Sequence, residues 1–169
     1  MIPIRDAGPR DRPAVLRLYA ALQDFERAFE PNRLPGEACA PHVDALLAWA
    51  ARDGFVLLAG PRAAPVGLLI AGRHDEGAYV LPENRPHGVV SDLYVAPEAR
   101  RKGLGLALLR TAETRFAAAG LRRMEISALA ANLPARALYD RWAGPPDSLT
   151  WAKPLRTWAK PLGPPPAGT

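Results

Sequence analysis

Cysteine is nearly absent from the sequence, since Cys39 is the only one among 169 residues. A lone cysteine excludes an intramolecular disulfide, and its alanine and proline neighbours offer it no metal or redox partner. Long apolar runs are also lacking. No stretch approaches the roughly 18 residues of a membrane-spanning helix, and the N-terminal residues lack the apolar stretch of a signal peptide. We therefore expect a cytoplasmic protein without a membrane partner.

Histidine is scarce as well, and its three positions argue against two classes of active site. His42, His74 and His87 have neither the spacing of metal ligands nor a serine partner in a hydrolase motif. The sequence therefore predicts no metal site and no serine hydrolase. We expect all three to be solvated loop residues, with His87 at the border of the pocket because it precedes an important strand.

The chain carries a net charge of +5, which indicates an anionic partner. Three of its basic residues, Arg100, Arg101 and Lys102, lie beside a Gly-x-Gly sequence. Arg122 and Arg123 precede a strand-like run, but no aromatic residues interleave with them as they do in proteins that bind single-stranded nucleic acid. We therefore expect a local phosphate site and no nucleic-acid partner.

The length of 169 residues fits one domain, because domains cluster near roughly 100 to 150 residues. We expect this domain to span residues 1–162. Residues 163–169 contain too few apolar side chains to pack, so they predict a disordered tail.

A short repeat precedes this tail, with TWAKPL at residues 150–155 and again at residues 157–162. The repeat is too short to be a unit of a solenoid. Two interpretations stay open. One copy pairs as the last strand and the other is surplus, which we prefer, or both form a hairpin, which Pro154 opposes.

Hydrophobic periodicity predicts helices and strands in a mixed order. Two apolar runs separated by turn residues indicate a hairpin, and later runs alternate between the two periods. The expected elements are strands at residues 2–4, 55–59, 66–71, 88–95 and 124–128, and helices at 15–29, 43–50, 104–119 and 134–142. This order predicts a mixed α/β fold, with about four helices around a sheet of about six or seven strands.

The clearest chemical signal is RRKGLG at residues 100–105, between a predicted strand and a predicted helix. Glycines let the backbone approach an anion, and the free N–H groups and dipole of a helix N-terminus favour a pyrophosphate there. Two other phosphate loops are excluded by particular residues. Lys102 precedes its glycine, unlike the lysine of a Walker loop, and Leu108 stands where the dinucleotide fingerprint needs a third glycine.

This loop resembles the pyrophosphate loop of the GNAT superfamily of N-acetyltransferases, which has Gln or Arg, two residues, Gly, any residue, then Gly or Ala. Two further segments are similar to this family: DLYVAP at residues 92–97, which looks like the end of its fourth strand, and ANLPARALY at residues 131–139. By element order the resemblance extends over residues 2–142. It implies the GNAT fold, with a central twisted mixed sheet.

The resemblance also implies a donor site. In this family a parallel pair of strands, here near Val90 and Ile126, splays apart, and acetyl-CoA lies between them. Backbone groups of Leu93 and Val95 would bond the pantetheine arm and the acetyl carbonyl, with Asn132 on the other side. The full set of expected cofactor-binding residues is Leu93, Tyr94, Val95, Arg100, Arg101, Lys102, Gly103, Leu104, Gly105, Asn132 and Ala135.

We expect the acetyl group to pass directly to an amine in a ternary complex, which needs a base for the amine and an acid for the departing thiolate. Tyr139 occupies the position of the family's usual acid. Asp92 is the leading candidate for the base, because a carboxylate in an apolar strand is either functional or paired. Glu83, Asp24 and Glu30 remain alternatives.

One departure from the family pattern follows the tyrosine helix. The family continues with Gly-Phe and a two-strand hairpin, whereas this chain has Gly144-Pro145-Pro146, so the sixth strand is missing, shortened or replaced. That hairpin often shapes the acceptor pocket and the dimer contact. We expect an acetyltransferase for a small-molecule or peptide amine, acting as a homodimer. The alternative is a non-enzymatic module of the same fold that senses acyl-CoA or binds a partner.

Overall fold

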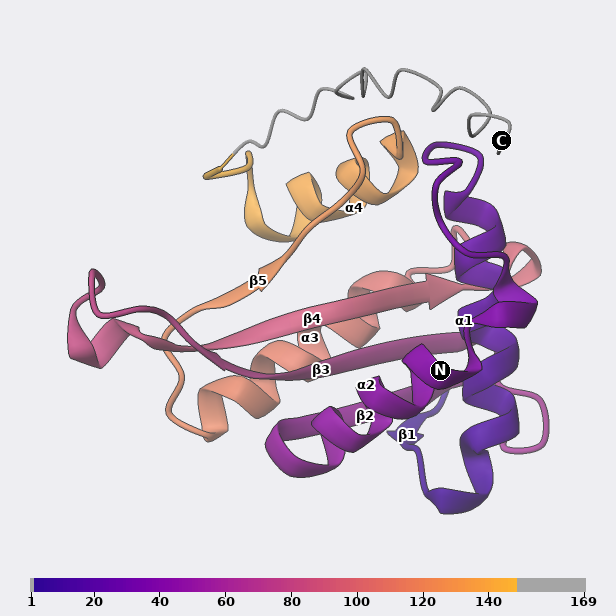
Figure 1. Cartoon of the computed structure of the whole chain (residues 1–169), viewed down its shortest axis with the longest axis horizontal. Coiled ribbons are helices and arrows are strands. Elements are labelled where there is room, and N and C mark those ends of the chain that lie inside the picture. Colours follow the sequence, from indigo (N-terminus) through magenta and orange to yellow (C-terminus); the bar gives the residue numbers. More distant parts are fainter. Residues whose placement is uncertain (1, 149–169) are drawn as a thin grey trace, which may run out of the picture.

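A computed structural model describes residues 2–148 (Figure 1). Five strands form one sheet in the order β1-β2-β3-β4-β5, with antiparallel pairing from β1 to β4 and a parallel pair of β4 and β5. In chain order the elements are β1 (Ile4–Asp6), α1 (Arg12–Glu26), α2 (Ala40–Asp53), β2 (Gly54–Ala59), β3 (Gly67–Asp75), β4 (Pro86–Val95), α3 (Leu104–Ala118), β5 (Met124–Ile126) and α4 (Leu133–Ala143).

Both faces of the central strands are covered, which explains why β2 and β3 are almost continuously apolar. Successive side chains of a strand point to opposite faces. Leu58, Leu68 and Ile70 therefore pack with α1 and α2, while Leu57 and Leu69 pack with α3. The sheet is the middle layer between two hydrophobic cores.

Helix α1 is held against the sheet by one apolar stripe. Val15, Leu18, Tyr19 and Leu22 follow helical spacing, and all four are buried. The helix ends at Glu26, earlier than the predicted residue 29. Residues 27–29 form turns instead of helix, although the apolar pattern from which the helix was predicted continues through them.

Strands β4 and β5 pair over only a short stretch and then part. Residues 88–90 of β4 pair with residues 124–126, after which β5 ends while β4 continues to Val95. Figure 1 shows the chain leaving β4 after β5 and running toward α4. The last residues of β4 therefore have an edge that faces no strand within the described part of the chain.

A β-bulge marks the place where the two strands part. Asp92 lies opposite Ile70, but Val90 lies opposite the next residue, Ala71, so Ser91 is an extra residue in β4. Bulges bend a strand and redirect its side chains, and they are frequent beside active sites. The bulge thus reorients the segment of β4 that carries the predicted site residues.

The mixed α/β fold, its four α-helices and the parallel strand pair agree with the sequence prediction. The predicted number of strands is wrong for residues 2–148, which contain five. After α4 the chain turns through Gly144, at φ 89°, into two prolines, and it forms no hairpin up to residue 148. The repeated segment and the expected tail lie outside the described residues. No helix between residues 2 and 148 is long and apolar enough to cross a membrane.

Candidate cofactor and catalytic site

A cavity of about 590 Å³ lies between the end of β4, the start of α3 and one side of α4, with Phe25 of α1 also in its wall. Lys102 and Asp92 are outside the wall. The other predicted site residues line it: Leu93, Tyr94, Val95, Arg100, Arg101, Gly103, Leu104, Gly105, Asn132, Ala135 and Tyr139. The fold thus brings three separate sequence motifs to one cavity.

The loop before α3 is shaped to present backbone N–H groups. Arg101 (φ 63°) and Gly103 (φ 77°) adopt the left-handed conformation, which is uncommon for a residue with a side chain. The first hydrogen bond of α3 joins the Ala107 N–H to the Gly103 carbonyl at 3.0 Å. The N–H groups of residues 104–106 therefore have no acceptor within the helix. A turn of this kind before a helix N-terminus favours an anion.

The cations of this loop differ in what they contact. Arg100 Nε donates to the Val95 carbonyl at 2.9 Å, and its guanidinium lies 5.0 Å from the centre of the Phe25 ring. Arg100 therefore ties the loop to β4 and α1, which the sequence did not predict. Lys102 Nζ donates to a backbone carbonyl of its own loop at 3.0 Å. Arg101 is exposed and lines the cavity, so it is the cation best placed to meet an anion.

Gly105 permits a close approach of α3 and α4. A Cβ at this position would stand 2.9 Å from Leu138 Cδ2 of α4. Asn132 directly precedes α4 and is buried, and its Oδ1 accepts a hydrogen bond from the Ala135 N–H at 3.2 Å. Asn132 therefore caps α4, and α4 is held in the position that directs Tyr139 to the cavity.

The end of β4 directs the backbone groups of alternate residues to its two edges. The Ala96 N–H donates to the Val66 carbonyl, beside β3, at 2.8 Å. By alternation the backbone groups of Leu93 and Val95 face away from β3, toward the gap left by β5. Both residues line the cavity, so an extended ligand in the gap can bond to β4 as a further strand would.

Tyr139 of α4 is partly buried in the cavity wall. Burial raises the pKa of its hydroxyl above the ordinary value, and the negative charges of Glu26 and Asp92 raise this pKa further. The hydroxyl therefore keeps its proton at neutral pH. It is therefore available as a proton donor to a departing thiolate, although a thiol has a pKa of roughly 8.5 and the raised pKa of Tyr139 makes this transfer uphill.

Asp92 lies in β4 next to the bulge, outside the cavity wall. Burial raises the pKa of its carboxyl, whereas the hydrogen bond from the Ser91 hydroxyl, at 2.6 Å, and the charges of His42 and Arg33 lower this pKa. The net direction is upward. A general base works best when its pKa lies near the operating pH, so the raised pKa of Asp92 makes it a better base at neutral pH.

Glu26 is a neighbour of these two groups that the sequence analysis did not consider for catalysis. It follows Leu22 by one helical turn, so the periodicity of α1 already placed it on the buried stripe. Burial raises the pKa of its carboxyl, and the Arg33 guanidinium, 2.9 Å away, lowers this pKa. The negative charge of Asp92 also raises the pKa of Glu26, and the charge of Glu26 in turn raises the pKa of Tyr139.

The three other acidic candidates lie elsewhere. Asp24 Oδ1 accepts a hydrogen bond from the Gly36 N–H at 2.8 Å, and Glu30 Oε2 is 2.8 Å from Arg33 Nε. Glu83 is exposed in the loop that precedes β4. None of the three lines the cavity.

Comparison with known proteins identifies the family. The model of the acetyltransferase (GNAT) family matches residues 18–144, a range that contains the whole cavity wall. This chain belongs to the GNAT acetyltransferase family. A search of curated proteins finds no match.

Solved structures share the GNAT fold of this chain. A GCN5-related N-acetyltransferase from Ralstonia eutropha is 25% identical, with a TM-score of 0.69 over 92% of this chain and 99% of its own. An aminoglycoside antibiotic 6'-N-acetyltransferase from Acinetobacter haemolyticus is 19% identical, with a TM-score of 0.68 over 90% of this chain and 99% of its own. A ribosomal-protein-alanine N-acetyltransferase from Brucella melitensis is 22% identical, with a TM-score of 0.67 over 92% and 99%.

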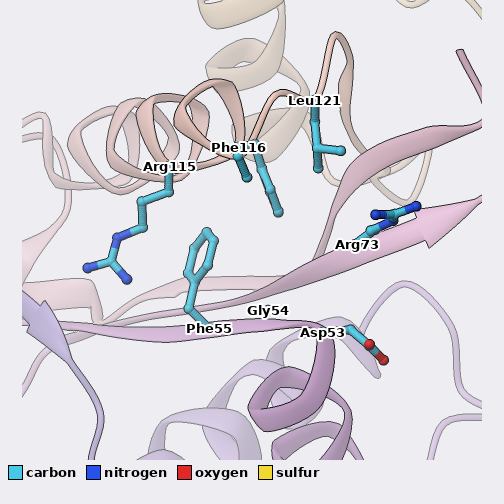
Figure 2. Close-up of a pocket in the computed structure, with 8 residues that line it drawn as sticks. Asp53, Gly54, Phe55, Arg73, Arg115, Phe116 and Leu121 are labelled. Atoms are coloured by element: carbon cyan, nitrogen blue, oxygen red, sulfur yellow. The ribbon is translucent and has the colours of Figure 1, made fainter. Parts of the chain in front are cut away.

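A second, smaller cavity of about 280 Å³ lies at the far end of α3 in this GNAT protein. Figure 2 shows Phe55 and Phe116 pointing toward each other, and their ring centres are 5.1 Å apart. Arg115 in its wall is paired with Asp6, with 2.9 Å between Nη2 and Oδ2. None of the predicted site residues lines this cavity, so the larger one is the candidate site.

The predicted loop position of the three histidines is wrong, although His42 and His74 are exposed to solvent as expected. His42 lies in α2, His74 in β3 and His87 in β4, and none of them is in a loop. His87 is fully buried at the start of β4, far from the end of the strand that lines the cavity. The prediction failed because β4 begins at Pro86, before the apolar run from which the strand was inferred.

Proposed function

We propose that this GNAT protein transfers the acetyl group of acetyl-CoA to an amine. The observation that carries the proposal is the wall of one cavity, which combines an anion-binding loop, a free strand edge and a partly buried tyrosine. A pyrophosphate, a pantetheine arm and a thiolate leaving group need these three features along one path.

The pyrophosphate lies against the free N–H groups of residues 104–106, where Arg101 supplies positive charge. Lys102 adds charge from outside the cavity, and Arg100 keeps the loop on β4. The phosphate end of the cofactor is therefore held mainly by backbone groups.

The pantetheine arm bonds to the free edge of β4 at Leu93 and Val95, beside Tyr94, and α4 covers it through Asn132 and Ala135. The acetyl carbonyl then lies near the bulge. Backbone N–H groups of β4 there stabilise the oxyanion as it develops.

In the reaction, the neutral amine attacks the thioester carbonyl carbon, and a C–N bond forms. Asp92 accepts the proton that the amine loses, directly or through water. The tetrahedral intermediate then collapses, the C–S bond breaks, and Tyr139 protonates the departing thiolate. The products are an acetylated amine and CoA with a free thiol.

The acceptor is an amine that is cationic before it reacts. Glu26 and Asp92 place two carboxyl groups near Tyr139, and such groups attract an ammonium ion. Two of the solved structures have names that state their acceptor, an aminoglycoside in one and a ribosomal-protein alanine in the other, and both acceptors carry amines. We propose a small-molecule or peptide amine as the acceptor of this chain.

A panel of amines tests this function. The chain is incubated with acetyl-CoA and an aminoglycoside, a polyamine, an amino acid or an N-terminal peptide, and the free thiol and the mass of the acceptor are measured. We expect thiol release together with one added acetyl group on at least one amine. Thiol release without an acetylated acceptor would contradict transfer.

The second candidate function is an acyl-CoA-binding module without turnover. It is favoured by the sequence after α4, where Gly144-Pro145-Pro146 stands in place of the Gly-Phe that precedes the family's hairpin. It predicts tight acetyl-CoA binding and no transfer to any amine. The homodimer and the cytoplasmic location stay predictions.

The Asp92→Asn variant is expected to gain stability while losing activity. Because its pKa is raised, the folded state holds the Asp92 proton more tightly than the unfolded chain does, and stability falls as pH rises from the unfolded to the folded pKa. Asparagine removes this loss, so Tm at neutral pH should rise while kcat falls roughly 100-fold. Thermal unfolding and steady-state kinetics check both. An unchanged kcat would exclude Asp92 as the base.

A further inference from the structure

A second cluster of polar groups lies at the opposite end of β4 from the cofactor cavity. Glu76 follows β3, His87 is in β4 and Glu125 is in β5. One nitrogen or oxygen from each of the three lies within 4.8 Å of the others. These residues are far apart in the sequence, which is why histidine spacing gave no sign of a metal site.

His87 is the unusual member of this cluster, because its side chain is 0% exposed. Its Nδ1 lies 3.0 Å from the Arg85 carbonyl, which can only accept a hydrogen bond, so Nδ1 carries a proton. The Nε2 of a neutral imidazole is then a lone pair. Within residues 2–148, His87 Nε2 is the only buried side-chain nitrogen or oxygen without a hydrogen-bond partner.

The surroundings of this lone pair are themselves acceptors. Glu125 Oε1 is 3.3 Å from His87 Nε2, without the geometry of a hydrogen bond, and Glu76 completes the group. A lone pair that faces carboxylate oxygens is repelled unless a positive species lies between them. No hydrogen-bond donor within residues 2–148 reaches Nε2, so a metal cation between this nitrogen and the carboxylates would satisfy all three groups.

We propose that Glu76, His87 and Glu125 form a binding site for a zinc-like divalent cation. One imidazole and two carboxylates, with room for water, are a donor set that zinc accepts. The contact of Nδ1 with the Arg85 carbonyl is the outer hydrogen bond that orients a metal-binding histidine. In a tetrahedral zinc site the ligand atoms lie roughly 3.3 Å from one another. The three ligand atoms here lie within 4.8 Å of one another, so small rotations of the two glutamates bring them to this spacing.

Two neighbours hold the glutamates in place without the metal. The Tyr79 hydroxyl donates to Glu76 Oε2 at 2.8 Å, and Arg123 Nη2 lies 2.9 Å from Glu76 Oε1 and 3.6 Å from Glu125 Oε2. The Arg123 side chain is 46% exposed, so it can swing into solvent when a cation enters. The positive charge of Arg123 repels a metal cation, so a variant without this arginine should bind the metal more tightly.

The site would fasten β5 to β4 at the paired end of the two strands. Glu125 pairs in register with Val89, beside His87, whereas the cofactor cavity begins at Leu93. The distance from His87 to Leu93 along the strand is about 20 Å. The metal therefore stabilises the short strand β5 and takes no part in transfer.

The test titrates zinc chloride into the whole chain after treatment with a chelator, using calorimetry and thermal unfolding. We expect one zinc ion per chain and a Tm that rises with zinc. Glu125→Gln and Glu76→Gln should each weaken binding by about 10-fold or more, as expected for loss of a ligand or its support. Arg123→Gln should tighten binding.

Glu83→Gln is the matched control, because this exposed carboxyl lies in the loop before β4 but outside the cluster. It should leave zinc affinity unchanged. The double variant Glu76→Gln/Glu125→Gln distinguishes the cluster from the other histidines and Cys39. Equal zinc affinity in this double variant would place the zinc elsewhere and overturn the proposal, as would the absence of binding at millimolar zinc.

Discussion

Tyr139→Phe should lower kcat by roughly 100-fold or more while leaving the affinity for acetyl-CoA unchanged, because a general acid contributes about 10²- to 10⁴-fold. The substitution removes the hydroxyl but keeps the ring that packs beside Leu138 and Trp142. The raised pKa of Tyr139 means that the wild-type protein keeps its acid through neutral pH. Steady-state kinetics with acetyl-CoA and a saturating amine measure the effect.

Tyr79→Phe is the control for loss of a tyrosine hydroxyl. Tyr79 is 83% exposed, and its hydroxyl bonds Glu76, away from the cofactor cavity. Its kcat should match that of the unmodified chain. If Tyr139→Phe also kept full kcat, the proton of the leaving thiolate would have to come from another group, and the role of Tyr139 would be packing alone.

Gly103→Ala should weaken acetyl-CoA binding by about 10-fold or more, which corresponds to about 1.4 kcal/mol. Gly103 has a φ of 77° and stands at the N-terminus of α3, in the cavity wall. Alanine is strained in this conformation by roughly 1 to 2 kcal/mol, and relief of that strain turns the N–H groups away from the pyrophosphate. Calorimetric titration with acetyl-CoA measures the dissociation constant.

Gly120→Ala is a closely matched control for this variant. Gly120 has a φ of 79°, and, as at Gly103, no atom lies within 4 Å of a Cβ placed there. Both variants should therefore lose similar free energy of unfolding. Only Gly103 lines the cavity, so equal losses of acetyl-CoA affinity in the two variants would show that general destabilisation, rather than the loop, is responsible.

The local motifs were predictable because their chemistry follows from neighbouring residues. The loop before α3 was predictable because its glycines stand between a strand pattern and a helix pattern, whereas Asn132 was expected only as a cofactor contact and also caps α4. Strand and helix order followed from periodicity, and the pairing of β4 with β5 came from the family resemblance. Apart from this strand pairing, each of these features depends on a few adjacent positions.

The features that the sequence did not reveal depend on contacts between distant segments. Arg100 looked like a phosphate ligand, but its contacts with Val95 and Phe25 require α1 to lie beside β4. His87 looked like a loop residue because it precedes the apolar run of β4, and its burial depends on neighbours from β3 and β5. Glu26 could have been recognised from its place on the α1 stripe, but its influence on Tyr139 required the fold.

Thermal unfolding with and without acetyl-CoA, followed in the same sample by release of free thiol after an amine is added, tests the central claim most directly. A ligand present at a concentration 100 times its dissociation constant adds about 2.7 kcal/mol to the free energy of unfolding. For a chain of this size, this corresponds to a rise in Tm of roughly 5 to 10 °C. We predict this rise and thiol release that depends on the amine. No change in Tm at millimolar acetyl-CoA would contradict the account, since the cavity would then not be a cofactor site.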